Sequence, residues 1–334
     1  AAIDPFVQSI KITCYRLAKD SKIVNALVNA VRNGKDVTAV VELRARFDEE
    51  ANLKWKSRLE DEGVKVILGL PDQKVHAKIC VIKKREFEHT KEYGFISTGN
   101  FNEGSAQYYG DHCLLTANRK LLSDVNRMFN YLEDPLHRIS QLKAIKTLAV
   151  APTTMRSFWF PLIDKEIKAA KSRKEASMII KLNSLVDATL IGKLYEAASA
   201  GVKVNLIVRG ICCVLTKQKS FVQPINAISI IDEYLEHARV LVFHNEGNPK
   251  VYISSADWMV RNLDHRVEAA CPILDKEISQ ELIDILNIQL AENVKGRVLD
   301  NQQKNEYVKS KEGAPEIRSQ VEIYDYLFKK TIAI

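Results

Sequence analysis

A series of segments in the first half of the chain recurs, in the same order, in the second half. A strand-like segment precedes a helical segment ending in glycine, a β-branched apolar segment, and a second strand-like segment whose third residue is a histidine. Five matched segments in one order are hard to obtain by chance, so we infer two copies of one unit. The pairs are IKITCYRL and MIIKLNSL, KIVNALVNAVRNG and TLIGKLYEAASAG, VTAVVEL and VKVNLIV, KVHAKICVI and LEHARVLVF, and GFISTGN and VYISSAD.

Strand and helix signals alternate within each copy. VTAVVEL is continuously apolar, as in a strand that is covered on both faces. This alternation predicts an α/β fold, with the two units related by a pseudo-twofold axis. We expect the first unit at residues 1–135 and the second at 136–334, the latter ending in a polar helical tail to which we assign no chemistry.

Composition limits the class of protein and the kind of partner. The chain has 334 residues, 46% of them hydrophobic, and a formal net charge of +7, which suits nucleic acid, phospholipid headgroups or a phosphate polymer. No apolar run approaches the ~20 residues that span a bilayer, and no signal peptide is evident, so we expect a soluble cytoplasmic protein. The six cysteines form no CxxC pair, which favours reduced thiols, most of them in the core.

His76 and His237 occupy the same position, the third residue, in equivalent segments of the two copies. A single histidine beside an apolar run is most often structural, but recurrence at equivalent positions favours a function. Neutral imidazole is a good nucleophile toward phosphorus near neutral pH. If the two units pair about a twofold axis, both histidines can face one cleft.

Cationic side chains accompany the histidines and the predicted strand ends. Lys78 and Arg239 each follow their histidine by two positions, and Arg16, Arg46 and Arg209 follow strands. Ligand sites in open α/β sheets collect at the carboxyl ends of strands. Phosphoryl groups need fixed positive charge as the transition state forms, so this pattern predicts a phosphate cleft.

The small polar segments STGN and SSAD differ at their last residue. Asn100 can donate a hydrogen bond to a phosphate oxygen, whereas an ionised Asp257 cannot. The two copies are therefore expected to have distinct roles.

The repeated HxK and GxN-like pattern resembles the phospholipase D superfamily, which implies phospholipase D-like α/β units. That signature carries an aspartate after the lysine, and the equivalent positions here are Lys83 and His244. The second copy also has Arg239 for lysine and Asp257 for asparagine. These departures weaken the assignment to a diester hydrolase.

A closer resemblance, to the C-terminal half of the bacterial polyphosphate kinase 1 family, covers the chain to about Asp275. It implies reversible transfer of the terminal phosphoryl group of ATP to inorganic polyphosphate, with Mg²⁺ and a phosphohistidine intermediate. The strings that carry it are AAIDPFVQSIKITCYRLAKDSKIVNAL, VELRARFDEEANLKW, KVHAKICVI, STGNFNEGSAQYYGDHCLLT, NSLVD, EHARV and SADWMVRNLDHRVEAACPI.

The resemblance also implies residue roles. His76 of HAK is the phosphorylated residue, and His237 of EHAR is a second catalytic group that protonates or positions the leaving oxygen. Lys78 is expected to assist them. The remaining expected contacts are Arg16 and Arg46 around the metal and phosphates, and Tyr109, Arg209, Asn100 and Arg239 on nucleotide or phosphate, with Tyr108 an alternative to Tyr109.

Two other classes stay open at this point. One is a phospholipase D-like hydrolase of nucleic acid or phospholipid, and the other is a non-catalytic module that binds polyanions. For the kinase, the resemblance implies ATP, ADP and polyphosphate as partners, no nucleic acid, and a homo-oligomer at full length. The family also has an N-terminal domain and a head domain before this region, so the isolated chain is expected to turn over poorly.

Overall fold

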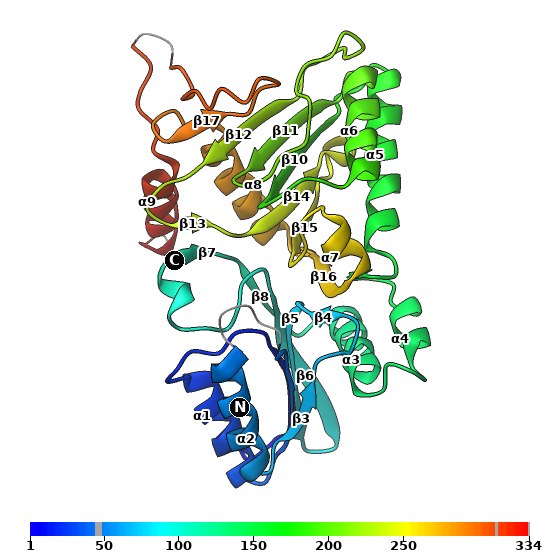
Figure 1. Ribbon diagram of the computed structural model, residues 1–334, viewed down its shortest axis with the longest axis vertical. Coiled ribbons are helices and arrows are strands. Elements are labelled where there is room, and N and C mark those ends of the chain that lie inside the picture. Colours follow the sequence, from blue (N-terminus) through cyan, green and yellow to red (C-terminus); the bar gives the residue numbers. More distant parts are fainter. Residues whose placement is uncertain (44–48, 311–312, 333–334) are drawn as a thin grey trace. The chain divides into compact units, whose positions relative to one another are not determined.

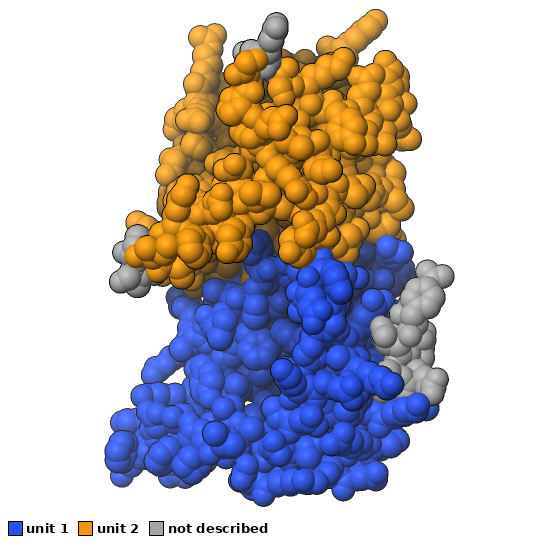
Figure 2. All heavy atoms as spheres, turned by 90° about the vertical axis from the view of Figure 1, so that its left-hand side faces the viewer, with its two compact units in different colours: residues 1–155, 254–256, 261–271 blue, residues 156–253, 257–260, 272–334 orange. Residues whose placement is uncertain are grey.

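The computed structural model describes residues 1–43, 49–310 and 313–332. Backbone contacts divide the chain into two compact units, coloured separately in Figure 2. Unit 1 contains residues 1–155, 254–256 and 261–271, and unit 2 contains residues 156–253, 257–260 and 272–334. Each unit is described by itself.

Unit 1 begins with the βαβαβ order that the sequence predicts (Figure 1). Its elements are β1 (Val7–Cys14), α1 (Lys22–Arg32), β2 (Asp36–Val41), α2 (Glu49–Asp61), β3 (Lys65–Leu68), β4 (Lys74–Val75), β5 (Lys78–Glu86), β6 (His89–Ser97), the 3₁₀ turn η1 (Ser105–Gln107), β7 (Tyr109–Gly110), β8 (Cys113–Thr116), α3 (Arg119–Glu133), α4 (Ile139–Lys143), β9 (Ala149–Ala151) and, far along the chain, β16 (Arg266–Pro272).

The main sheet of unit 1 has the strand order β3-β2-β1-β5-β6-β8. Strands β1, β2 and β3 are parallel, and β5 returns antiparallel beside β1, with Ile10 opposite both Val37 and Ile82. In Figure 1, α1 and α2 lie on one face of this sheet and α3 on the other. Because both faces are covered, β2 is buried from Val37 to Val41, and its residues there are apolar except for Thr38.

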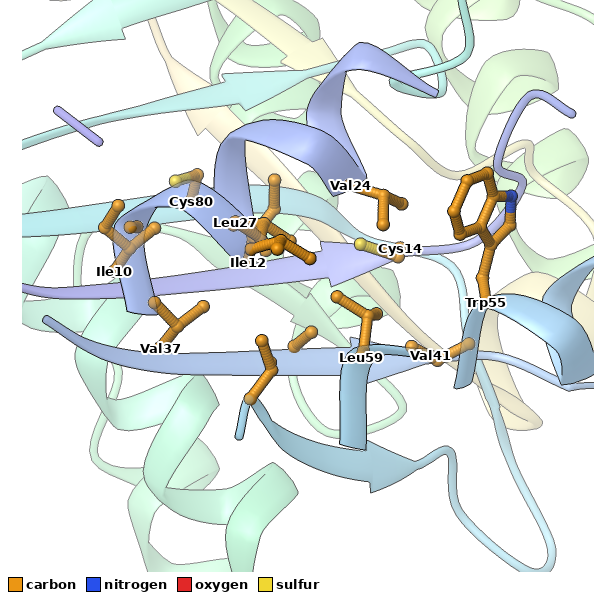
Figure 3. Close-up of a cluster of buried hydrophobic side chains, with 14 of the residues drawn as sticks. Ile10, Ile12, Cys14, Val24, Leu27, Val37, Val41, Trp55, Leu59 and Cys80 are labelled. Atoms are coloured by element: carbon orange, nitrogen blue, oxygen red, sulfur yellow. The ribbon is translucent and has the colours of Figure 1, made fainter. Parts of the chain in front are cut away.

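The core of unit 1 lies between this sheet and helices α1 and α2 (Figure 3). Val24 and Leu27 of α1 and Trp55 and Leu59 of α2 point toward Ile12 and its neighbours on the strands. Ser21 is the capping residue of α1, and its side chain accepts a hydrogen bond from the N–H of Val24. The helical periodicity therefore places the apolar face of each helix on the sheet.

Unit 2 repeats this design. Its sheet order β17-β12-β11-β10-β14-β15 contains the same parallel triplet and antiparallel return as β3-β2-β1-β5-β6, which confirms the predicted repeat. Its elements are α5 (Met155–Lys171), β10 (Ser177–Leu182), α6 (Ala188–Ala200), β11 (Lys203–Val208), β12 (Asn226–Ile230), β13 (Leu235–Glu236), β14 (Arg239–Phe243), η2 (Asn245–Gly247), β15 (Lys250–Ser254), α8 (Lys276–Leu290), β17 (Gly296–Val298) and α9 (Ser319–Ile332). Helix α7 (Val260–Asp264) belongs to unit 1 from Arg261 onward.

Each compact unit is made of several segments of the chain, so no single position in the sequence separates the two units. Strand β16, from the second sequence copy, pairs with β4 and with β9 inside unit 1. These pairings carry residues 261–271 into unit 1. The predicted division at residue 135, which concerns the sequence copies, stays a prediction.

None of the described helices combines the length and apolar character needed to cross a bilayer. The cysteines are free thiols, and Cys14, Cys80 and Cys271 are buried as predicted, whereas Cys113 and Cys213 are exposed. Burial raises the pKa of Cys14 and of Cys271 to about 12, so these two thiols stay protonated and inert near neutral pH.

The core around α2 gives a direct test of this packing. We expect Leu59→Ala to lower the free energy of unfolding of unit 1 by about 2–4 kcal/mol, because Leu59 is fully buried and leaves a cavity. Leu53→Ala, at an exposed position of the same helix, should change it by less than about 0.5 kcal/mol. Denaturant unfolding measures both, and equal effects would contradict the assignment of the core face.

Candidate active site

His76 lies in a break between two strands. Strand β4 ends at Val75 and β5 begins at Lys78, so the segment KVHAKICVI is not the single strand that the sequence predicts. The N–H groups of His76 and Ala77 both donate to the carbonyl oxygen of Val267 on β16, at 2.9 and 2.8 Å. Two residues share one acceptor there, and regular pairing stops at the histidine.

A buried carboxylate orients the ring of His76. Nδ1 of His76 lies 2.9 Å from Oε2 of Glu268, whose side chain is fully buried. An ionised carboxylate can only accept, so the proton of the neutral ring is at Nδ1 and the lone pair is at Nε2. His76 itself is 7% exposed. The pair therefore fixes the tautomer of the neutral ring, with the lone pair on Nε2.

The carboxylate of Glu268 is itself held in place. It accepts hydrogen bonds from the Ser255 hydroxyl and, at 2.9 Å, from Nδ2 of Asn262, and the Arg266 guanidinium lies 3.9 Å from Oε1. Burying a charge is costly unless it is paired and hydrogen-bonded. These partners stabilise the ionised form of Glu268.

Lys78 and His76 contact the same aromatic ring, that of Tyr15. The His76 and Tyr15 rings meet edge to face at 4.8 Å, and the Lys78 ammonium lies 5.1 Å from the Tyr15 centroid. Lys78 also donates to the backbone carbonyl of His76. Lys78 and His76 are thus linked through the backbone oxygen of His76 and the ring of Tyr15.

The second copy has a similar break, between β13 and β14, with His237 inside it. Nη1 of Arg239 donates to the carbonyl oxygen of His237 at 2.9 Å and lies 3.2 Å from its Nε2. A guanidinium can only donate, so Nε2 of His237 is the acceptor and carries no proton. Lys78 and Arg239 therefore bond the carbonyl of the histidine in their own copy, and Arg239 also contacts the imidazole of His237.

Arg239 forms a buried ion pair with Asp257, at 3.2 Å for both Nε and Nη2. Burial acts to raise the pKa of Asp257, but the Arg239 guanidinium and two backbone N–H groups outweigh it and hold the pKa below its usual value. Asn100 stands at the equivalent position of the first copy, and its buried Oδ1 has no hydrogen-bond partner in the described part of the chain. The copies thus differ in charge as the sequence indicates.

In each unit, the residue that follows the second strand forms a hydrogen bond to the backbone of the residue before the histidine. Oε2 of Glu42 accepts from the N–H of Val75 at 2.8 Å, and Nε of Arg209 donates to the carbonyl oxygen of Glu236 at 3.0 Å. Arg209 also donates to Asn183, whose amide bonds the carbonyl of His237. Arg209 therefore follows β11, as the sequence indicates, and the structure places it against the histidine segment.

The other predicted residues have less defined surroundings. The guanidinium of Arg16 lies 5.8 Å from the Tyr15 ring, beside the residues that contact His76. Tyr109 is half-buried in β7, whereas Tyr108 is exposed. Arg46 lies outside the described residues. The shared cleft of the two histidines stays a prediction, because each unit is described by itself.

The sequence prediction missed Glu268, although a signal for it exists. Asp111 follows Asn100 by eleven positions, and Glu268 follows Asp257 by the same number. In the structure, the hydroxyl of Thr98 donates to Asp111 at 2.5 Å, and that of Ser255 donates to Glu268. This matched spacing of a hydroxyl and a carboxylate could have identified Glu268. Tyr15 and Glu42 carry no comparable signal.

The repeated α/β units and their histidine-containing strand breaks define a protein with a phospholipase D-like fold. A solved structure of phosphatidylserine synthase from Haemophilus influenzae shares this fold, with a TM-score of 0.56 at 14% identity, over 98% of this chain and 89% of that one.

Two sequence models match most of the chain. The one described as polyphosphate kinase C-terminal domain 1 matches residues 1–138, and the one described as polyphosphate kinase C-terminal domain 2 matches residues 148–320. The chain belongs to the polyphosphate kinase family.

Individual relatives agree with this assignment. Polyphosphate kinase of Vibrio cholerae serotype O1 is 49% identical over 98% of this chain and 46% of its own length. The crystal structure of polyphosphate kinase from Porphyromonas gingivalis matches all of this chain and 50% of that one, with a TM-score of 0.90 and 40% identity. The chain therefore spans about half the length of the relatives that it matches.

The buried pair of Arg239 and Asp257 makes stability depend on pH. Because the folded-state pKa of Asp257 is depressed, its contribution is present above the unfolded value of about 3.9 and is lost as the pH falls through the folded value. We expect Asp257→Asn to lower the free energy of unfolding of unit 2 by about 3 kcal/mol at pH 7, with the difference shrinking below about pH 4.

Denaturant unfolding of both proteins at pH 7, 5 and 3 measures this dependence. Glu246→Gln is the matched control, because Glu246 pairs with Lys174 on the surface and its loss should leave stability nearly unchanged. A difference that stays constant across this pH range would show that the charge of Asp257 is not its cause.

Proposed function

We propose that this chain is the catalytic region of a polyphosphate kinase and that His76 carries the phosphoryl group. Nε2 of His76 attacks the terminal phosphorus of ATP, an N–P bond forms, and the bond to the bridging oxygen breaks to release ADP. An oxygen at the end of polyphosphate then attacks the same phosphorus and the N–P bond breaks. Both steps are reversible. The observation that carries this proposal is the hydrogen bond between Nδ1 of His76 and Glu268.

Glu268 serves this chemistry in two ways. It fixes the proton of the neutral ring on Nδ1, so the lone pair that can attack phosphorus is the one on Nε2. It also places a negative charge beside the ring as the imidazole becomes positive during attack. This is the part that a buried carboxylate plays beside a catalytic histidine in hydrolases.

Fixed cations would stabilise the transferred group. Phosphoryl transfer depends mainly on positioning and on neutralising charge on the equatorial oxygens. We propose this part for Lys78 beside His76, and for Arg16 and Arg209, which follow β1 and β11. Arg46, Tyr109, Asn100 and Arg239 stay proposed contacts to phosphate or nucleotide on the family resemblance.

Mg²⁺ would come with the substrate. The described residues contain no group of three or more His, Cys, Asp or Glu side chains that could hold a metal ion. Mg²⁺ usually keeps several waters and binds substrate phosphates with one or two carboxylates, so a protein cage is not needed. When bound, it would offset charge on the phosphates, and Arg16 and Arg46 are proposed to lie around it.

His237 is proposed as the second catalytic group, which positions or protonates the leaving oxygen. In the neutral form described above, Nε2 faces the Arg239 guanidinium and holds no proton. Donation from Nε2 therefore requires that this atom first gain a proton, whereas positioning of an oxygen does not. Arg239 stays paired with Asp257 in either case.

We further propose the cytoplasm as the location of this protein and a homo-oligomer as its assembly at full length. ATP, ADP and inorganic polyphosphate are the proposed partners, in keeping with the name that the relatives carry. The exclusion of nucleic acid stays a prediction.

Phosphorylation of His76 is the first test. After incubation with ATP and Mg²⁺, intact mass and peptide mapping should show an acid-labile phosphoryl group on His76, and His76→Ala should abolish it. His89→Ala, at an exposed position of β6, is the matched control and should keep the adduct. The assay is run on this chain and on a longer chain that has the full length of its relatives.

An adduct that persists in His76→Ala would contradict the mechanism. Cleavage of a phosphodiester without ATP, with no adduct in either chain, would favour the hydrolase class. Salt-sensitive binding of polyanions with neither activity would favour the binding module.

The role of Glu268 has its own test. We expect Glu268→Gln to slow formation of the adduct by about 10²-fold or more, because the amide keeps the shape but not the charge beside the imidazole. Rapid-quench kinetics measure the rate. Glu277→Gln, on the exposed first turn of α8, is the control with the same chemical change and should match the unaltered chain. An unchanged rate in Glu268→Gln would contradict this role.

A further inference from the structure

The start of the C-terminal helix is bonded to the segment that precedes His237. Nε2 of Gln320 donates to the carbonyl oxygen of Tyr234 at 2.8 Å, and its Oε1 accepts from the N–H of Tyr234 at 3.0 Å. The same Nε2 donates to Oε1 of Glu236 at 2.8 Å. One side chain thus satisfies both backbone groups of Tyr234 and a carboxylate next to His237. The polar tail, to which the sequence assigns no chemistry, contacts a proposed catalytic segment.

Two neighbours of Gln320 strengthen this attachment. Arg318 donates through Nε and Nη2 to both oxygens of Asp232, each at 2.8 Å, which is the bidentate geometry of strong ion pairs. The N–H and hydroxyl of Ser319 both donate to Oε2 of Glu292, which lies just after α8. Residues 318–320 are therefore fixed on one side to Glu292, which follows α8, and on the other to residues 232–236.

Glu236 connects this attachment to the interior of unit 2. Its Oε2 accepts from Nζ of Lys181 at 2.5 Å and from Gln289 of α8 at 2.7 Å. Burial acts to raise the pKa of Glu236, but Lys181 and the two glutamine amides outweigh it and hold the pKa below its usual value. Its backbone carbonyl accepts from Arg209. A shift of Glu236 would thus move the next residue, His237, and also the carbonyl oxygen that accepts from Arg209.

The attachment is local and polar. Ser319 is the buried residue of α9, whereas its apolar side chains such as Tyr324 and Phe328 are exposed. The helix therefore contributes little apolar burial to unit 2. Its most densely bonded part is the end that contacts the segment before His237.

We propose that residues 318–320 form a clamp that positions His237, with Gln320 and Arg318 as its positioning residues. This rests on the proposed function in one respect, namely that His237 takes part in transfer. Without the clamp, the backbone groups of Tyr234 lose their bonds to Gln320 and Asp232 loses its ion pair with Arg318, so His237 and Arg209 sample a wider range of positions. The clamp thus extends the catalytic arrangement to the C-terminal helix.

The test follows His237 directly by its reaction with diethyl pyrocarbonate, read by peptide mass mapping at neutral pH. Gln320→Met keeps the length of the side chain and removes its three hydrogen bonds. We expect it to speed modification of His237 by about fivefold or more, because local opening becomes easier. Arg318→Met is a second variant with the same expected direction. His76, in the same sample, should react at an unchanged rate.

Tyr326→Phe is the matched control, because it removes a 2.8 Å hydrogen bond from α9 to Asp284, away from residues 232–236. It should leave the His237 rate within about twofold. Rates at His237 that do not change in Gln320→Met and Arg318→Met would overturn the proposal. So would a rise that is equal at His76 and His237, because that would indicate general loosening.

The transfer assay adds a second readout. Gln320→Met should lower kcat about fivefold, leave the KM for ATP within about twofold, and have no further effect when His237 is already Ala. An equal loss in both backgrounds would overturn the clamp. If the unaltered protein transfers no phosphoryl group, the proposed function fails, whereas the reagent measurement on His237 still decides the clamp.

Discussion

The candidate site depends on one hydrogen bond between residues 192 positions apart, from Nδ1 of His76 to the carboxylate of Glu268. Around it, β16 pairs with β4 and with β9, and the carbonyl of Val267 holds the backbone at His76. A buried charge needs several polar partners, and Glu268 has them in Ser255 and Asn262. The fold of unit 1 therefore builds the surroundings of the carboxylate, and the carboxylate determines which ring nitrogen of His76 holds the proton.

The two copies use one backbone plan with different charges. Each histidine lies in a strand break, and the residue after the second strand holds the residue before the histidine. In the first copy that residue is the anion Glu42, and in the second it is the cation Arg209. The cation two residues after the histidine is paired with Asp257 in the second copy, where the first copy has the neutral Asn100. Duplication thus supplied the geometry, and substitution made the two positions unequal.

The sequence predicts the repeated α/β plan because periodicity and capping are local properties. The helix from Ser21 and the apolar strand β2 follow from such patterns. The partner of His76 does not, because only the folded chain brings residue 268 to residue 76, although the matched spacing to Asp111 was available. The break at His76 was missed because hydrophobicity gives no sign of an interrupted ladder. The contacts of Gln320 depend on tertiary packing, so composition alone made the tail look inert.

The long separation of His76 from Glu268 also has a consequence for synthesis. A ribosome adds about 5–20 residues per second, so roughly 10–40 s pass between the appearance of the histidine and that of its carboxylate. During that interval the first βαβ segments can already be folded, since α1, α2 and β1 to β3 are close in sequence. The nascent chain then carries a histidine whose tautomer is not yet fixed by Glu268. Under the proposed function, phosphoryl transfer at His76 begins only once most of the second copy has left the ribosome.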